Sequence, residues 1–382
     1  MSDFIPYGKQ DVTDADIKAV VDVLKSNSLT QGAVVPLFEE KLVTLTKAKF
    51  GTAVNSATSA LHLACLALNV QPGDLVWTVP NTFVASANCA LYCGARVDFV
   101  DIDLNTSNLS IDKLKEKLIL AQKAGDLPKV VIPVHLSGEP CDMAAIKILS
   151  DQFNFKIIED ASHAIGGSYK KSAIGSCKYS DITVFSFHPV KIITTGEGGA
   201  LLTNCDKLDS RLKLLRSHGI TRDKNSMKYP TEDSWYYEQI ALGFNYRMTD
   251  IHAALGLSQL SRLNEYVDKR HKIAKTYDNE FHNSRVQKPT RNTENKSALH
   301  LYIIQTDEEN HKIIFNKFRE RNIGVNLHYI PVHTHPYYQK LGFKWGDFPN
   351  SEEYYRRAIS LPIFPTLEPE SQQYVIDTVK SL

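Results

Sequence analysis

Apolar residues recur along the chain in two alternating patterns, one with the period of a helix and one with the continuous runs typical of buried strands. Residues 13–25 have the helical period, with Thr13 as the expected N-cap. From residue 50 onward, helical stretches alternate with strands. The expected strands are 75–79, 96–102, 129–136, 156–159, 181–187 and 200–204, and the expected helices are 57–68, 83–92, 111–121 and 144–153. This alternation predicts βαβ units and a mostly parallel sheet that is buried on both faces.

The pattern changes after residue 220. Residues 221–239 are polar and have no clear period, which indicates a loop, and a long helical pattern then runs from near Thr249 toward Phe281. The remainder predicts a smaller α+β unit, with strands at 299–305 and 325–328 and helices at 308–321, 352–359 and 369–379. We therefore expect an N-terminal segment that packs near the small domain (1–25), a large domain (26–248) and a small C-terminal domain (249–382).

Composition excludes several classes of protein. Lysine and arginine number 44 against 43 acidic residues, so the net charge of +1 argues against binding to nucleic acid or to an anionic membrane. No apolar run is long enough to span a membrane, and the start of the chain has no signal-peptide pattern. The six cysteines form no C-x-x-C pair, which favours reduced thiols in a cytoplasmic protein. No metal site is expected: His328, His333 and His335 lie close together, but their segment holds two prolines and no carboxylate, as in a substrate-contact or surface loop.

The densest chemical motif is residues 185–200, FSFHPVKIITTGEGGA, in which Lys191 follows an apolar strand. Desolvation would lower the pKa of this lysine and make it a better nucleophile, as imine chemistry requires. The segment fits equally well a lysine whose stem packs on the strand end while its ammonium stays in water. The glycines that follow match neither the P-loop nor the dinucleotide-binding pattern. We expect them to allow a tight turn beside a bound group.

A second motif, KIIEDASHAIG at 156–166, ends an apolar strand at Asp160. A buried, unpaired carboxylate is costly, so Asp160 needs a cationic partner, and a protonated pyridine nitrogen would serve. The alternative is an ordinary carboxylate that caps the next helix. His163 is either a hydrogen-bond partner for a phenolic oxygen or a core histidine.

A third motif, VNSATSAL at 54–61, brings small and hydroxyl residues directly to the start of a helix. Free N–H groups at a helix N-terminus bind phosphate, and the hydroxyls of Thr58 and Ser59 can add to them. A plain N-cap explains the motif equally well. Together, however, the three motifs suit one ligand, a phosphorylated pyridine aldehyde that can form an imine.

At these residues the chain resembles the pyridoxal-phosphate-dependent nucleotide-sugar aminotransferases of the DegT/DnrJ/EryC1/StrS family. The resemblance covers nearly the whole chain, and the order and spacing of its motifs agree. The motifs are SLTQG (28–32), NSATSALHLA (55–64), NTFVASAN (81–88), DASHAIG (160–166), SFHPVKIITTGEGG (186–199), FNYRMTDIHAALGLSQL (244–260) and SLPIFPTL (360–367). The resemblance implies the type I fold of aspartate aminotransferase. In that fold a large domain with a mainly parallel seven-stranded sheet precedes a smaller α+β C-terminal domain.

The resemblance also implies a role for each matching residue. Lys191 takes the position of the catalytic, imine-forming lysine, where a histidine would have implied a dehydratase, and Asp160 that of the catalytic partner of the pyridine nitrogen. The resemblance further implies that His163 lies near the ring hydroxyl of the cofactor and that Phe83 stacks on its ring. The cofactor is PLP or its amino form, PMP. Its phosphate would be bound by Thr58, Ser59, Ser186 and a neighbouring subunit's Asn245. Candidate substrate contacts are Tyr7, Arg247, His328 and Tyr329. The expected assembly is a homodimer with shared active sites.

Within the family, FIPYGKQDVTDADI, SNSLTQG and NSATSALHLACLAL most resemble the aminotransferases of pseudaminic acid synthesis. This implies amino transfer from L-glutamate to C4 of a UDP-4-keto-6-deoxy-N-acetylhexosamine, UDP-2-acetamido-2,6-dideoxy-β-L-arabino-hexos-4-ulose. The product would serve flagellin glycosylation or surface polysaccharide. The alternatives are the bacillosamine, legionaminic and perosamine pathways. Two other classes of protein are disfavoured. A PLP-binding regulator would need an extra DNA-binding domain, and a nicotinamide oxidoreductase would need GxGxxG near its start; the sequence shows neither a spare basic segment nor this motif.

Overall fold

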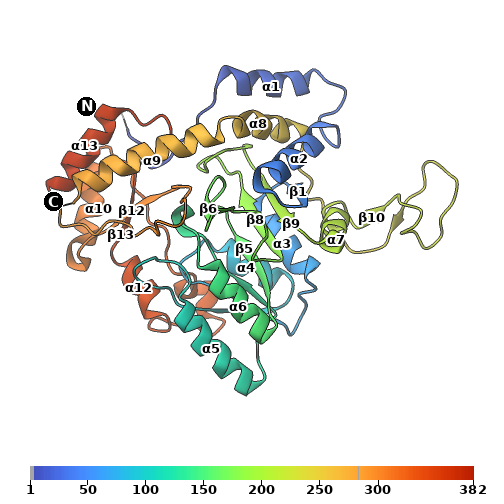
Figure 1. The fold of residues 1–382 in the computed structure, drawn as a ribbon, viewed down its shortest axis with the longest axis horizontal. Coiled ribbons are helices and arrows are strands. Elements are labelled where there is room, and N and C mark those ends of the chain that lie inside the picture. Colours follow the sequence, from blue (N-terminus) through green and yellow to red (C-terminus); the bar gives the residue numbers. More distant parts are fainter. Residues whose placement is uncertain (1–3, 283) are drawn as a thin grey trace.

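The computed structural model describes residues 4–282 and 284–382, and a central sheet organises the first half of the chain (Figure 1). Its seven strands are β1 (Phe50–Val54), β2 (Leu75–Thr78), β3 (Arg96–Phe99), β4 (Val130–Ile132), β5 (Lys156–Asp160), β8 (Ile182–Ser186) and β9 (Gly199–Thr203). In space they follow the order β1-β9-β8-β5-β4-β2-β3. Strand β9 runs antiparallel to both of its neighbours, and the other adjacent strands are parallel. The mainly parallel seven-stranded sheet is therefore as predicted.

Helices cover both faces of this sheet, because consecutive apolar residues of its strands point to opposite sides. On β5, for example, Ile157 joins one apolar cluster and Ile158 joins the other. The first cluster includes side chains of α2 (Val34–Thr46), α5 (Ile111–Ala124) and α6 (Met143–Phe153). The second includes α3 (Ala57–Ala67), α4 (Ala85–Tyr92) and α7 (Asp206–Arg216). This double burial explains why the strands are apolar runs rather than alternating ones.

The C-terminal part has an apolar core of its own, built around an antiparallel pair of strands, β12 (Tyr302–Gln305) and β13 (Ala358–Leu361). The helices of this part are α9 (Leu263–Glu280), α10 (His311–Glu320), α11 (Pro336–Gln339), α12 (Pro349–Tyr355) and α13 (Pro369–Lys380). Before them, α8 (Asp250–Leu260) packs on α1 (Asp14–Leu24) and on α2. Buried Asp16 of α1 accepts hydrogen bonds from Arg262 (2.6 Å) and Gln259 (3.0 Å), which ties the N-terminal segment to the α8–α9 junction.

Several predicted elements were wrong or incomplete. The single helix from 249 to 281 is two helices, because the chain breaks at Ser261 and Arg262, where the Ser261 hydroxyl donates to the carbonyl of Ser258 (2.6 Å). The strand at 325–328 does not form, and only Asn326 pairs, with Ser360. The predicted helix at 352–359 ends at Tyr355, and Ala358 begins β13, since short apolar runs suit either structure. Helices α2 and α7 were not predicted.

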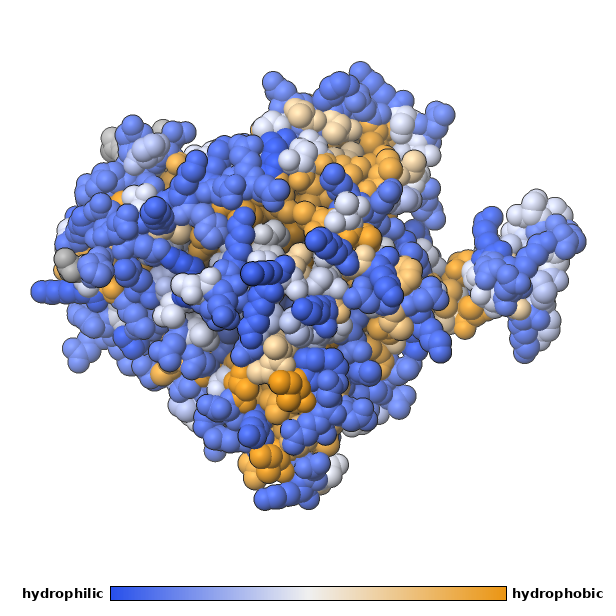
Figure 2. Space-filling model, in the orientation of Figure 1, coloured by the Kyte–Doolittle hydropathy of each residue, from blue (hydrophilic) through white to orange (hydrophobic). Residues whose placement is uncertain are grey.

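Residues 221–239, predicted as a loop, form a projecting arm (Figure 1). The short strands β10 (Ile220–Thr221) and β11 (Glu238–Gln239) pair at its base. Trp235 within the arm is 72% exposed, and Leu242 beside its base is 80% exposed. Figure 2 shows apolar surface where the arm joins the body. Among the helices in the described part of the chain, none has both the length and the apolarity that crossing a membrane requires.

Candidate active site

Four chain segments meet at one edge of the central sheet. Strands β1, β5 and β8 end there, and β9 begins there because it runs in the opposite direction. Gly199, the first residue of β9, pairs with Val54 on one side and with Ser186 on the other. Asp160, the last residue of β5, lies opposite Val184 of β8. Residues 54, 160, 186 and 199 are thus brought to the same place.

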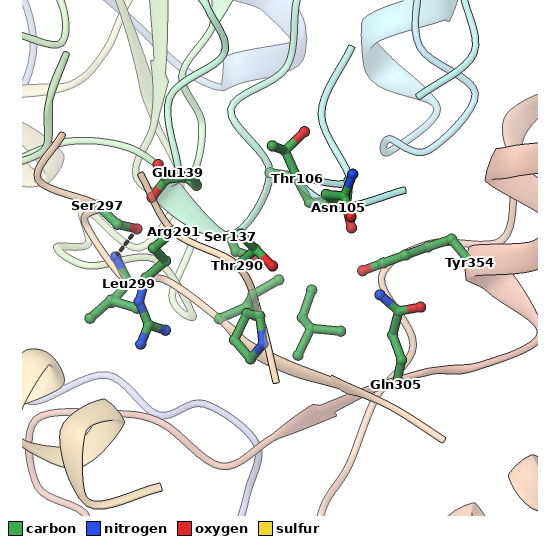
Figure 3. A pocket seen from close by; sticks show the side chains of 15 residues that line it. Asn105, Thr106, Ser137, Glu139, Thr290, Arg291, Ser297, Leu299, Gln305 and Tyr354 are labelled. Carbon is green, nitrogen blue, oxygen red and sulfur yellow. Dashed lines mark hydrogen bonds between the residues drawn. The ribbon is translucent and has the colours of Figure 1, made fainter. Parts of the chain in front are cut away.

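A cleft of about 610 Å³ opens at this edge. Of the site residues predicted from the sequence, it brings together Tyr7, Thr58, Phe83, Asp160, His163, Ser186, Lys191, His328 and Tyr329. Ser59, Asn245 and Arg247 are not among the residues that line it. A second cavity, shown in Figure 3, lies between the loops after β3 and β4 and the C-terminal part, and at about 40 Å³ it is too small for a cofactor.

Lys191 lies in the loop between β8 and β9 and lines the cleft. The buried residues Ile192 and Ile193 anchor this loop beneath it. Burial lowers the pKa of the lysine to about 8, although the nearby Asp160 carboxylate acts in the opposite direction. At pH 7 about a tenth of Lys191 is therefore the free amine, the form that attacks carbonyl groups, which is far more than for an ordinary lysine.

Asp160 is 5% exposed, yet it forms no ion pair within the described residues. Its carboxylate accepts hydrogen bonds from the Ser86 hydroxyl (2.6 Å) and from the backbone N–H of Ser162 (3.1 Å). Ser86 is itself held by Thr82, whose hydroxyl oxygen lies 2.8 Å away. A buried carboxylate with two neutral donors and an open side toward the cleft suits a cationic partner that is bound there.

The imidazole of His163 lies beside two other rings. Its Nε2 atom is 3.0 Å from the Tyr329 hydroxyl, and its ring centroid is 4.4 Å from that of His300. The Nδ1 atoms of His163 and His300 are buried and have no hydrogen-bond partner. Burial, with added repulsion from nearby groups including Lys191, holds the pKa of both histidines well below the usual value, so both are neutral.

The N-terminus of α3 forms another wall of the cleft. Ser56 is the N-cap, and its hydroxyl oxygen accepts a hydrogen bond from the N–H of Ser59 (3.1 Å). The other N–H groups of the first turn have no acceptor within the helix. A Cβ atom at Gly199 would lie 2.6 Å from the nitrogen of Ala57, so only glycine lets β9 pass this close beneath the turn. The arrangement is a compact anion site with hydroxyls at Ser56, Thr58 and Ser186.

The C-terminal part covers the cleft from the other side. Buried His328 bonds through Nδ1 to Ser360 (2.7 Å) and packs against the ring of Tyr7 (5.4 Å between centroids). Burial, aided by Lys191, lowers the pKa of His328 to about 3. The Tyr7 carbonyl accepts from the N–H of Ile363 (3.1 Å), which fixes the N-terminal segment here. Phe83 is 58% exposed, with its ring 6.4 Å from that of Tyr329.

The predicted residues that do not line the cleft lie close to it along the chain. Ser59 contacts Ser56 through its hydroxyl (3.0 Å) on the helix side of the cap. Arg247 pairs with Val54 of β1, and the carbonyl of the adjacent Tyr246 accepts from the N–H of Asn55 (2.9 Å). Asn245 is exposed on the same segment. Residues 245–247 therefore border the α3 N-terminus on the outer surface of the chain.

Sequence reasoning missed Ser86, Ser56 and His300. Ser86 stands in the quoted motif NTFVASAN and Ser56 in VNSATSAL, so position within a motif could have indicated both. His300 lies in no such motif and reaches the cleft only through tertiary structure. Its N–H donates to the Ser137 carbonyl (2.8 Å), and its carbonyl accepts from the buried Arg270 (3.1 Å).

The cleft fits pyridoxal phosphate on features of the chain itself. Asp160 offers a buried carboxylate that has no cationic partner within the described residues, and Lys191 offers a partly neutral amine. The α3 turn above Gly199 offers a phosphate site. The unpartnered Nδ1 of His163 offers one further polar contact.

Comparison with known proteins agrees with this chemistry. The model of the DegT/DnrJ/EryC1/StrS aminotransferase family matches residues 10–380. The chain is 38% identical to the spore coat polysaccharide biosynthesis protein SpsC of Bacillus subtilis, over 99% of this chain and 97% of that protein. It is 37% identical, with the same coverage, to the UDP-4-amino-4,6-dideoxy-N-acetyl-beta-L-altrosamine transaminase of Campylobacter jejuni.

Solved structures give the same result. The putative sugar aminotransferase Spr1654 of Streptococcus pneumoniae in its PMP form superposes with a TM-score of 0.90 at 31% identity, covering 99% of this chain and 98% of that one. Helicobacter pylori PseC, an aminotransferase of pseudoaminic acid biosynthesis, superposes with a TM-score of 0.89 at 33% identity, covering 98% of both chains. The chain belongs to the DegT/DnrJ/EryC1/StrS aminotransferase family and is a PLP-dependent sugar aminotransferase. The predictions of family, fold class, enzyme class and cofactor are confirmed.

Proposed function

We propose that this family member transfers the amino group of L-glutamate to C4 of UDP-2-acetamido-2,6-dideoxy-β-L-arabino-hexos-4-ulose, a step of pseudaminic acid biosynthesis. The observation that carries the chemistry is that Lys191, whose pKa is lowered, lines one cleft with the buried carboxylate of Asp160, which has no ion-pair partner among the residues that the structure describes. Full-length similarity to the Campylobacter jejuni transaminase and to PseC supports the choice of sugar.

In this proposal Asp160 is the group that keeps the ring nitrogen of the cofactor protonated. Its carboxylate is fixed by Ser86 and Ser162, so it needs no reorganisation when a cation binds. When bound, pyridoxal phosphate supplies an electron sink for the electron pair left when the donor's Cα–H bond breaks. The negative charge of Asp160 maintains the cationic ring on which that sink depends.

Lys191 then has two tasks. Its amine holds the cofactor in the resting enzyme, and once released it removes the proton from Cα of the amino donor. A pKa of about 8 suits the second task, because a group that takes and returns a proton near neutral pH works best with a pKa near the ambient pH. The buried Ile192 and Ile193 keep the loop in place while the amine moves.

The first turn of α3, with the hydroxyls of Ser56 and Thr58, would hold the phosphate together with Ser186 of β8, and Phe83 would cover the ring. We place the sugar nucleotide on the opposite side of the cleft, where Tyr7 and His328 come from segments far apart in the sequence. Lys191 is the only lysine or arginine among the described residues that line the cleft. The anionic groups of the substrates therefore need cations from elsewhere.

A second copy of the chain would provide them. Asn245 and Arg247 border the α3 N-terminus on the outer surface. The arm near them projects away from its own body and exposes Trp235, and Leu242 is exposed beside its base. We propose a homodimer in which Asn245 of each chain completes the phosphate site of the other and Arg247 lies at the shared site.

Two experiments test these proposals. Borohydride reduction of the purified enzyme followed by peptide mapping is expected to place the cofactor on Lys191, and a label on another lysine would refute the site. A panel of UDP- and dTDP-linked 4-keto sugars, assayed with glutamate, should give the highest kcat/KM with the UDP sugar named above. Another nucleotide 4-keto sugar is the second candidate, because SpsC is as similar to the chain as the Campylobacter jejuni transaminase.

A further inference from the structure

Three of the six cysteines gather between helices α3 and α4, outside the cleft. Cys65 lies on α3, Cys89 lies on α4, and Cys93 is the C-cap of α4. All three are buried and belong to the same apolar cluster on one face of the central sheet. They are not among the residues that line the cleft, so the proposed reaction does not use them.

Helical spacing turns these side chains toward one another. Cys89 and Cys93 are four residues apart and lie on the same side of α4, and His62 and Cys65 are three residues apart on the same side of α3. The two sides face each other, because α3 packs on α4 and the His62 ring lies edge-on, 5.5 Å from the ring of Tyr92. The Cys65 thiol accordingly interacts with the thiols of both Cys89 and Cys93.

The surroundings of Cys93 differ from those of the other two cysteines. Its sulfur interacts with the Cys65 thiol on one side and with the His62 imidazole on the other. The imidazole is held in place by the Tyr246 hydroxyl, which lies 3.2 Å from its Nδ1 atom. Cys93 thus has both a neighbouring thiol and a neighbouring base.

The three thiols also differ in acidity. The hydrogen bond with Cys65, aided by His62 and opposed by burial, lowers the pKa of Cys93 to about 6. At pH 7 Cys93 is therefore mostly a thiolate, the reactive form of this side chain. Hydrogen bonds with the other two cysteines, together with burial, raise the pKa of Cys65 well above its usual value, so Cys65 stays a thiol. The Cys89 thiol donates to the carbonyl of Ser86 within its own helix (3.3 Å), which leaves Cys65 as the partner across the helix interface.

We infer that Cys93 and Cys65 form a redox-sensitive pair that hydrogen peroxide oxidises to a disulfide between α3 and α4. In the first step the Cys93 sulfur attacks one peroxide oxygen, the O–O bond breaks, and the departing oxygen takes up a proton and leaves as water. The product is a sulfenic acid. In the second step the Cys65 sulfur attacks the Cys93 sulfur, the S–O bond breaks, and the hydroxyl leaves with the thiol proton as a second water. The two sulfurs together lose two electrons, and the peroxide gains them.

The position of the pair allows this reaction while the cofactor site is occupied. Both cysteines belong to the C-terminal ends of their helices, whereas the N-terminus of α3 is the end that forms a wall of the cleft. Cys93 is 8% exposed, so a small peroxide can reach it from outside. The disulfide would join the helix of the phosphate turn to the helix that carries Ser86, which donates to Asp160 (2.6 Å). The inference does not depend on which sugar the enzyme uses.

The wild-type holoenzyme provides the first test. Reduced protein is treated with hydrogen peroxide at pH 7, digested without reductant and analysed by mass spectrometry. The expected product is a Cys65–Cys93 cross-link that is two hydrogens lighter than the separate peptides and is reversed by dithiothreitol. Cys177 should stay unmodified, because burial raises the pKa of its thiol to about 12. A Cys93 that remains a free thiol, or a cross-link that joins it to Cys89 instead, would overturn the inference.

Variants separate the roles of the two cysteines. In Cys65→Ser the sulfenic acid of Cys93 has no thiol to react with, so dimedone should label Cys93 and no cross-link should form. In Cys93→Ser, Cys65 should remain a thiol. Cys205→Ser is the control, because it removes an exposed thiol outside the cluster, and it should form the cross-link as wild type does.

A second readout needs neither peroxide nor a variant. The rate at which iodoacetamide alkylates Cys93 in the wild type should reach half its maximum near pH 6, against about 8.5 for an ordinary thiol. A midpoint near 8.5 would overturn the inference, even where a variant fails to fold.

Discussion

Replacing Asp160 by asparagine separates the charge of this residue from its place in the structure. The substitution keeps size and shape at a position that is 5% exposed. The amide oxygen can still accept from the N–H of Ser162. The amide nitrogen faces the Ser86 oxygen, which can accept it because the Ser86 hydroxyl can turn toward Thr82, 2.8 Å away. Folding and cofactor binding should therefore persist.

The expected loss of rate follows from the loss of a preorganised charge beside the reacting ring. Removing one preorganised electrostatic contact from an active site costs about 2.7–4 kcal/mol of transition-state stabilisation. Since each ~1.4 kcal/mol is a tenfold change in rate, kcat should fall by about 10²- to 10³-fold. Asp181→Asn is the control, because Asp181 accepts from the N–H of Ile157 (2.9 Å) at the opposite end of β5 and does not line the cleft. Its kcat should stay within about twofold of wild type.

The assay is the stopped-flow rate of the glutamate half-reaction, followed by cofactor absorbance. Reconstitution with pyridoxal phosphate methylated on the ring nitrogen gives a permanently cationic ring. If the role of Asp160 is to maintain that cation, the analogue should restore a large part of the lost rate in Asp160→Asn. An undiminished kcat in the variant, or a lost rate that the analogue does not restore, would refute the reasoning.

Three further predictions follow from the same geometry. Gly199→Ala should weaken pyridoxal phosphate binding at least tenfold in an absorbance titration, because the new Cβ would lie 2.6 Å from the nitrogen of Ala57. Gly8→Ala is the control and should bind as wild type does, because its Cβ would have no contact closer than 3.8 Å. In cofactor-free enzyme the acetylation rate of Lys191, followed by mass spectrometry, should reach half its maximum near pH 8, because the amine is mostly protonated below its pKa of about 8. The acetylation of exposed lysines should have its midpoint near ~10.4. Lys191→Ala and Asn245→Ala chains, each inactive alone at limiting cofactor, should regain about a quarter of wild-type activity when refolded together. Activity no greater than the mean of the two parents would place Asn245 outside a shared site.

The part of the chain that forms the central sheet was largely predictable because local patterns and tertiary environment agree there. Strands such as Ile182–Ser186 are buried on both faces, so their apolar runs mark them directly. The C-terminal part was harder, since its strands are short and pair at long range. The run Ala358–Leu361 is a strand only because β12 lies beside it, and the sequence around it suits a helix equally well.

The residues of the candidate site also differ in how far local sequence predicts them. Lys191, Asp160 and Thr58 could be predicted, because each follows or precedes an apolar element in a way that restricts its chemistry. His300 could not, and the role of Ser86, although it stands in a quoted motif, could not be read from the motif alone, since each takes its place through contacts with residues far away in the sequence. Ser86 reaches Asp160 across 74 positions, and His300 is held by Arg270, which is fully buried and donates to backbone carbonyls of two separate segments.

The antiparallel strand β9 explains why the motifs of this chain are spaced as they are. In a purely parallel sheet, the chain after Ser186 would have to cross over and return to the opposite edge before adding another strand. Because β9 instead turns back beside β8, Gly199 lies at the same edge as Ser186 and directly beneath the first turn of α3. The short connection between them, residues 187–198, must therefore remain at this edge, and it carries Lys191. The reversal of strand direction at β9 therefore explains why one motif carries both Lys191 and Gly199, the glycine that lies beneath the first turn of α3 at the proposed phosphate site.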